Sequence, residues 1–421
     1  MKESFLHAVW RYSLYTPTAL VTEGGEQVTV LSNGLYNTNA GPDFLEAKVK
    51  VGKTVLVGHI EMHINSSDWK KHNHDKDEAY SNVILHVVYH DDAKDATPNI
   101  PVLCIAPFIP KLVLEQYHSL IQANTKLPCS SQLPQVKDIT KEAWLTRLLA
   151  ERWEEKLKTW EELLQQSAGD WRSLLYWRLA ANFGFKVNAE PFLALAQSIP
   201  INILAKHGDN LKQIEALLFG QSGLINEESE DDYAKALYQE YSFLQKKYKL
   251  TPLRAYSWVF MRMRPANFPT VRIAQFAVLI HQSIPLFSKV IEKEEVKQIM
   301  SLFESTASEY WDTHYRFGEE SAVKRKKKLG SSSILNIIIN TVAPIKFLYA
   351  SEMGTTDDQE KALTLIDSLP VEQNHILDIW QQHKWLAANA AQSQAQIQLY
   401  NGYCKPKRCI ECAIGLSIIK S

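Results

Sequence analysis

Residues 54–64 read TVLVGHIEMHI, and this stretch decides the fold of the first part of the chain. It is rich in aliphatic side chains, and from His59 onward polar side chains alternate with apolar ones. Because successive side chains of a strand point to opposite faces, the pattern predicts a strand with His59, Glu61 and His63 on one face. The isoleucines and the methionine between them then form the opposite, buried face.

Further strand signals lie on both sides of this stretch. Alternating or β-branched runs are separated by turn-forming Asn, Gly, Pro and Asp residues, and Gly52-Lys53 predicts a hairpin turn. A short amphipathic helix is expected over residues 3–11. The predicted strands are residues 27–32, 45–51, 54–64, 82–90 and 100–106. We therefore predict an α+β domain over residues 1–137, with a mostly antiparallel sheet.

The hydrophobic period changes beyond residue 138. Apolar residues, many of them tryptophans, recur at helical spacing between charged residues, and no fixed repeat length is present. We interpret the tryptophans as core residues. The predicted helices are residues 140–166, 171–183, 211–219, 233–248, 271–282, 334–349, 375–385 and 387–400. The fold class is thus α+β: an N-terminal α+β domain (1–137) followed by an irregular all-α domain (138–421).

Composition indicates a globular, soluble protein. Of 421 residues 45% are apolar and 22% charged, and the formal net charge is -1. Neither region has the strongly basic balance typical of phosphate-backbone binding. The most apolar stretch, residues 334–350, is interrupted by polar residues and predicts a buried helix, not a membrane span. Five cysteines and no secretory signal favour a cytoplasmic location without a membrane partner.

Histidines are concentrated in one part of the predicted α+β domain. Of the thirteen histidines, six lie within residues 59–90. Imidazole nitrogens and carboxylate oxygens bind divalent cations, so the sequence predicts a Mg or Zn site. The candidate catalytic residues are Asp43, Glu61 and His63, and the candidate metal ligands are Asp43, Glu61, His63, His72, His74 and His86. The alternative is that these histidines are simply paired with neighbouring carboxylates on a half-exposed sheet.

Two resemblances bear on this segment. Residues 1–106, with Pro42-Asp43 before one strand and Glu61-Met62-His63 on the next, resemble the restriction-endonuclease-like nucleases. That resemblance implies a Mg²⁺ ion held by Asp43 and Glu61 that activates water for attack on a phosphodiester. The nuclease pattern has lysine where this chain has His63.

The whole chain more closely resembles an uncharacterised bacterial family, a domain of unknown function. The resemblance is carried by the blocks at residues 39–44, 61–69, 83–88 and 264–269 and by the cysteine tail. It implies a shared architecture but no known activity.

Three hypotheses for function follow. The leading one is a metal-dependent phosphodiesterase of the nuclease kind that acts on nucleic acid. The second is a non-enzymatic module in which a degenerate nuclease-like scaffold binds a protein partner; the near-zero net charge and the missing lysine favour it. The third is a zinc-dependent hydrolase that uses the histidine cluster.

Three cysteines close to the C-terminus form a separate motif. Cys404, Cys409 and Cys412 have a C-x4-C-x2-C spacing, and the x2 pair is typical of thiolates that chelate one ion. Cys129 is a candidate fourth ligand. We predict a structural zinc or iron–sulfur centre there; the alternative is ordinary reduced thiols.

Basic residues form two further clusters in the helical region. One surrounds Arg264 and Arg272, and the other is the run KRKKK at residues 324–328 before a serine-rich helix start. Arg264, Arg272 and Lys326 are therefore candidate anion-binding residues. The alternatives are a solvated linker for the lysine run and helix capping or ion pairing for the arginines.

Overall fold

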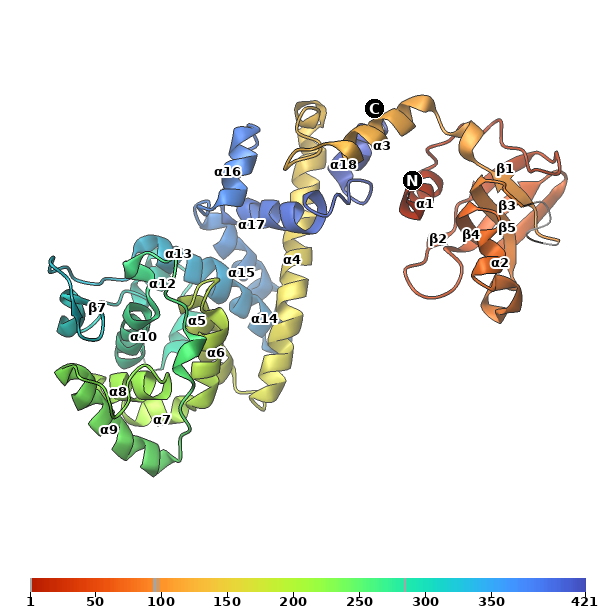
Figure 1. The fold of residues 1–421 in the computed structure, drawn as a ribbon. Helices are drawn as coiled ribbons and strands as arrows, with labels where there is room; N and C mark the ends of the chain where they lie inside the picture. The colour runs from red at the N-terminus through yellow and green to blue at the C-terminus, as the bar shows by residue number, and fades with distance from the viewer. Residues whose placement is uncertain (1, 94–96, 98, 284) are drawn as a thin grey trace. The chain divides into compact units, whose positions relative to one another are not determined.

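The computed structural model describes all residues except 1, 94–96, 98 and 284 (Figure 1). It divides the chain into two units: residues 1–147 together with 397–421, and residues 148–396. The expected boundary lay after residue 137. In the structure residues 138–147 and the end of the chain, residues 397–421, also belong to the first unit. There α18 (Ala413–Ile419) lies beside α3 (Lys111–Gln122), and Lys407 Nζ donates a 2.8 Å hydrogen bond to the carbonyl of Ile121.

The first unit contains a mixed sheet. Antiparallel pairs join β1 to β3, β2 to β3 and β3 to β4, whereas β4–β5 and β5–β6 are parallel. The strand order is β1-β3-β4-β5-β6, with β2 also paired to β3. The strands are β1 (Val28–Ser32), β2 (Leu35–Tyr36), β3 (Phe44–Val51), β4 (Thr54–Asn65), β5 (Val83–His90) and β6 (Val102–Cys104). The expected α+β fold with a mostly antiparallel sheet is confirmed.

The strand predicted over residues 54–64 is β4, which lies near the middle of this sheet. The predicted hairpin is confirmed, since Val51 pairs with Thr54 across Gly52-Lys53. Ile60 and Met62 are fully buried, as expected, but Glu61 and His63 on the other face are also buried. The polar face of β4 is therefore an enclosed site and not a solvated surface.

Helices complete the first unit. α1 (Glu3–Arg11) matches its predicted bounds and buries Phe5, Leu6, Val9 and Trp10. The single-turn helix α2 (Asp68–Lys71) follows β4, and Trp69 is buried there. The long helix α4 (Asp138–Gln166) begins in the first unit and continues into the second.

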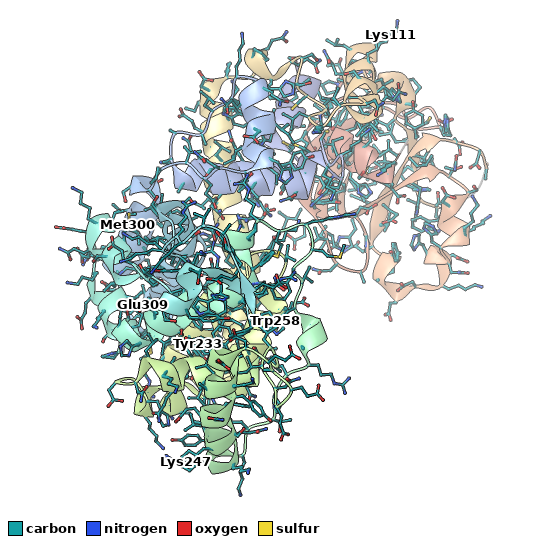
Figure 2. All side chains as sticks on the ribbon, turned by 60° about the vertical axis from the view of Figure 1, so that its left-hand side comes forward. Lys111, Tyr233, Lys247, Trp258, Met300 and Glu309 are labelled. Atoms are coloured by element: carbon teal, nitrogen blue, oxygen red, sulfur yellow. The ribbon has the colours of Figure 1, made fainter. Side chains whose placement is uncertain are left out.

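The second unit is helical, with the small hairpin β7 (His314–Arg316) and β8 (Glu319–Glu320). One apolar core runs through it, and Trp153, Trp160 and Trp311 belong to that core, as predicted. In Figure 2 Trp258 lies among the side chains of this unit, while the exposed Lys247 extends from it. The helices are α5 (Trp171–Phe183), α6 (Ala189–Ser198), α7 (Ile201–Lys206), α8 (Leu211–Gln221), α9 (Asp232–Tyr248), α10 (Pro269–Ser283), α11 (Leu286–Glu292), α12 (Val296–Leu302), α13 (Ser331–Ile337), α14 (Ala343–Met353), α15 (Thr356–Ser368), α16 (His375–Gln382) and α17 (Ala390–Gln398).

The most apolar helical segment runs from Ser331 to Met353, where a π-helical stretch (Ile338–Val342) joins α13 to α14. By length and composition alone it is able to cross a membrane, but 61% of its most apolar window is buried inside the protein. This agrees with the predicted core helix.

Candidate metal site

The backbone of β4 and the turn before β3 bring two carboxyl groups together. Asp43 ends the turn that contains Gly41-Pro42, and its amide donates a 3.2 Å hydrogen bond to Glu61 Oε2. In return Asp43 Oδ2 accepts a 2.9 Å hydrogen bond from the amide of Met62. These reciprocal bonds fix the two acids side by side where β3 begins next to β4.

Three histidines lie beside the Glu61 carboxyl group, which contacts His63 and His74 directly. His63 Nε2 lies 3.4 Å from Glu61 Oε1 and 3.1 Å from His72 Nδ1. His74 Nε2 lies 3.4 Å from the same Glu61 oxygen. The ligand atoms of His63, His72 and His74 all lie within 4.8 Å of one another. Because α2 and the 3-10 turn after it fold back onto β4, residues nine and eleven positions beyond His63 reach the same site.

The spacing of these atoms suits one cation. Donors that share an ion at 2.0–2.2 Å lie about 3–3.5 Å apart in tetrahedral or octahedral geometry. The Glu61–His63, His63–His72 and Glu61–His74 distances fall in that range, whereas the three histidine ligand atoms are within 4.8 Å of one another and Glu61 is not part of that set. His74 Nε2 is also buried without a hydrogen-bond partner, which leaves one donor atom facing the group unsatisfied. His72 is exposed, so solvent reaches the group on that side.

His86 lies behind His63 and does not complete the ligand group. Glu61 and His86 are neighbours across the parallel β4–β5 pair, and His63 Nδ1 lies 2.9 Å from His86 Nε2. A histidine whose Nδ1 is held in this way directs the lone pair of Nε2 away, here toward Glu61 and His72. The structure thus gives His86 a contact that positions the His63 ring, and its role as a ligand stays a prediction.

Burial favours the neutral forms of Glu61, His63 and His86 in the metal-free site. Burial and the neighbouring Asp43 carboxylate raise the pKa of Glu61 to about 9. Burial, followed by the charges of the other histidines, lowers the pKa of His63 to about 3, and burial lowers the pKa of His86 to about 4. A divalent cation would restore the negative charge of Glu61, since opposite charge favours the ionised form.

Two further residues of the site were missed by the sequence analysis. His7, on α1, lies 3.3 Å from Asp43 Oδ2, and its other ring nitrogen lies 3.3 Å from the hydroxyl of Tyr36. Tyr80 stacks on His74 with 3.8 Å between ring centroids. The sequence shows that Glu3, His7 and Arg11 share one face of α1, but no residue near them in the sequence indicates that Asp43 is a neighbour.

A pocket of about 510 Å³ adjoins the site through His7. The Arg11 guanidinium lies over the rings of both Tyr12 and Tyr36, at 5.4 and 5.2 Å from their centroids. These residues line the pocket together with Arg147. It therefore combines two cations with aromatic faces beside the carboxylate–imidazole group.

Sequence comparison places the chain in a family. A family model described as "Protein of unknown function (DUF2851)" matches residues 3–375. The chain belongs to the DUF2851 family. No curated protein and no solved structure matches the chain, so the resemblance to restriction-endonuclease-like nucleases receives no support from these comparisons.

The other candidate residues of this DUF2851 protein are not among the contacts of the histidine group. Cys129 and the three tail cysteines are buried in the first unit. In the second unit Arg272 and Lys326 line one pocket of about 240 Å³, whose lining does not include Arg264. The Arg272 guanidinium donates to the neutral side chains of Asn267, Gln275 and Ser333. Anion binding there stays a prediction.

Proposed function

We propose that this DUF2851 protein is a metal-dependent phosphodiesterase that acts on nucleic acid, with Glu61, His63, His72 and His74 as the metal ligands. The observation that carries the proposal is the set of His63, His72 and His74, whose ligand atoms lie within 4.8 Å of one another, with Glu61 Oε1 3.4 Å from two of them and His72 exposed. Three imidazoles and one carboxylate favour a transition metal such as zinc or manganese over magnesium.

The chemistry divides between the metal and the residues around it. A bound divalent cation supplies a water of lowered pKa and neutralises charge on a phosphoryl oxygen. Asp43, 20% exposed and paired with His7, stands next to the ligand group and is the candidate to accept a proton from the attacking water. His86 holds the His63 ring in the orientation that presents Nε2.

The substrate class is inferred from the neighbouring pocket. Guanidinium groups bind phosphate oxygens, and aromatic faces stack on unpaired bases, so a pocket with Arg11, Arg147, Tyr12 and Tyr36 suits a single-stranded segment. The near-zero net charge argues against a long basic track, so we expect a short stretch of nucleic acid to be held. The free cysteines fit a reducing, cytoplasmic location.

The test is cleavage of a labelled single-stranded oligonucleotide by the full chain, after removal of metals with a chelator and re-addition of Zn²⁺, Mn²⁺ or Mg²⁺. We expect cleavage that depends on a transition metal and falls at least roughly a hundredfold in Glu61→Gln. Glu115→Gln, on the exposed face of α3, is the matched control and retains activity.

Two results would overturn the proposal. One is an absence of cleavage with every metal, and the other is equal cleavage by the Glu61→Gln and Glu115→Gln variants. Metal binding without cleavage would instead favour the non-enzymatic module, in which the same scaffold binds a partner.

A further inference from the structure

Four of the five cysteines belong to the first unit and are buried there. Cys129 lies between α3 and α4, and Cys404, Cys409 and Cys412 lie in the tail that returns to this unit. Each of the four is 6–8% exposed, and none forms a disulfide. The fifth, Cys104 on β6, is half-buried and donates to the carbonyl of Tyr89, so it is a separate residue with a separate contact.

The four sulfur atoms are close enough to influence one another electrostatically. Burial raises the pKa of the Cys404 thiol well above its ordinary value, and the charges of Cys412, Cys129 and Cys409 raise it further. The pKa of Cys129 is raised to about 12 by burial and then by Cys412 and Cys409. Each member of the set therefore interacts with the others, across 275 positions of sequence between Cys129 and Cys404.

Groups that stabilise a thiolate surround this set. Burial raises the pKa of Cys412, while hydrogen bonds from the backbone N–H groups of Gly415 and Ile414 and from the indole of Trp144 act in the opposite direction. Trp144 Nε1 is buried and has no conventional hydrogen-bond partner, so its contact is this sulfur. A Cβ atom at Gly415 would lie 2.1 Å from the carbonyl oxygen of Cys409, so the chain is folded too tightly here for any side chain.

We propose that Cys129, Cys404, Cys409 and Cys412 bind a metal centre through four thiolates and thereby fasten the C-terminal tail to the segment after α3. As each metal–sulfur bond forms, one thiol loses its proton to solvent. Binding therefore releases protons and leaves four thiolates as ligands of the metal centre. This inference is independent of the proposed function, because it uses no residue of the histidine group.

The spacing of the sulfurs distinguishes two kinds of centre. Four sulfurs around one zinc ion at about 2.3 Å lie roughly 3.8 Å apart. Among the described residues the cysteines are not a group whose ligand atoms are close enough for one ion. We therefore expect an iron–sulfur cluster, which is assembled from iron and inorganic sulfide and holds its thiolates farther apart than a single ion does.

The competing explanation is that reduced cysteines fill the core here as small apolar side chains. Such packing explains burial, but it does not explain why four of five cysteines from two distant segments share one location. Nor does it explain the indole and the two amides that are directed at one of them.

The decisive experiment is X-ray absorption on the full chain, purified without oxygen, together with iron, sulfide and zinc analysis. We expect iron and sulfide in the protein and an iron edge with sulfur neighbours at about 2.3 Å. A zinc edge with four sulfur neighbours would support the four-thiolate site and overturn the cluster. A protein free of both metals, or a metal with only nitrogen and oxygen neighbours, would overturn the site altogether.

Variants then assign the ligands. Cys409→Ser and Cys129→Ser should lose the sulfur-coordinated metal and expose the tail to limited proteolysis, whereas Cys104→Ser, the matched control, should lose neither. Glu61→Gln should keep the sulfur-coordinated metal, which separates a failure of this inference from a failure of the proposed function. Equal metal content in Cys409→Ser and Cys104→Ser would contradict the assignment.

Discussion

At Glu61 two effects act in the same direction: burial and the adjacent Asp43 carboxylate both oppose ionisation of its carboxyl group. The neighbouring histidines are held neutral by burial as well. In the metal-free site Glu61, His63 and His86 are therefore buried in their neutral forms, and His74 Nε2 and His86 Nδ1 have no hydrogen-bond partner. A bound cation would favour the ionised form of Glu61 and would accept the lone pairs of the histidine ligands.

The opposite pKa shifts predict how stability depends on pH in metal-free protein. The pKa values of His63 and His86 in the folded protein are about 3 and about 4, against an ordinary 6.5, so both stay neutral there. Below pH 6.5 the unfolded state therefore binds more protons than the folded state, and the free energy of unfolding falls as the pH is lowered. Glu61, with a folded pKa of about 9 against 4.5, keeps its proton, so stability falls as pH rises toward 9. These groups together place maximum stability near pH 6.5.

Urea unfolding of chelator-treated protein checks this prediction. From about pH 6.5 to 8.5 the free energy of unfolding should fall by about 1–2 kcal/mol more in the natural protein than in Glu61→Gln. Added Zn²⁺ should abolish the difference in the natural protein. Parallel curves for the two proteins would show that the Glu61 carboxyl is already ionised.

His86 provides the second prediction at this scale. Its contact with His63 Nδ1 orients the ligand nitrogen, so His86→Ala should weaken metal binding by about 10- to 100-fold without removing a ligand. Competition with a chromophoric chelator measures the affinity. His90→Ala, at the exposed end of the same strand, is the control and should bind metal as the natural protein does. Equal affinities for both variants would mean that His63 needs no support.

At the scale of elements, the sequence predicted the strands of the first unit better than the short helices of the second. β1, β3, β4 and β5 lie within a residue or two of their predicted bounds, because alternation and turn residues are local signals. The last strand is shorter than predicted, since a 3-10 turn (Ala106–Phe108) follows it closely. Five helices of the second unit, α6, α7, α11, α12 and α15, were not predicted, and most of them are too short to show a clear period.

α1 supplies the prediction that belongs to this scale. One face of the helix is buried, and the other presents His7 to the metal site and Arg11 to the adjoining pocket. Arg11→Gln should therefore weaken binding of a short single-stranded oligonucleotide by about tenfold and reduce its salt dependence, while metal affinity is unchanged.

Fluorescence anisotropy at two salt concentrations gives both values for Arg11→Gln. The control is Lys53→Gln in the β3–β4 turn, where the same charge is removed from a residue that does not line the pocket. An oligonucleotide affinity that drops equally in the two variants would show that overall charge, and not the pocket, governs binding.

At the scale of the whole molecule, the division into an α+β part and a helical part was predictable because the hydrophobic period changes near residue 138. The return of residues 397–421 to the first unit was not predictable, since it depends on tertiary contacts such as those between α18 and α3. The grouping of Cys129 with the tail was suggested by cysteine chemistry, not by any local pattern. His7 could not be placed for the same reason.

In the candidate site, too, local patterns were predictable and tertiary contacts were not. Glu61 and His63 share a face because a strand has period two, which the sequence shows directly. His72 and His74 reach them only because α2 turns the chain back, and His86 only because β5 pairs with β4 in parallel register. Residue types therefore predicted the members of the site, whereas their separate roles required the structure.

The most direct test of the account is an anomalous difference map from crystals of the full chain soaked with Zn²⁺, recorded at the zinc edge. The account predicts a peak among Glu61 Oε1, His63 Nε2, His72 Nδ1 and His74 Nε2, about 2.0–2.2 Å from each. A map with no peak there, while the four side chains keep their present contacts with one another, would contradict it.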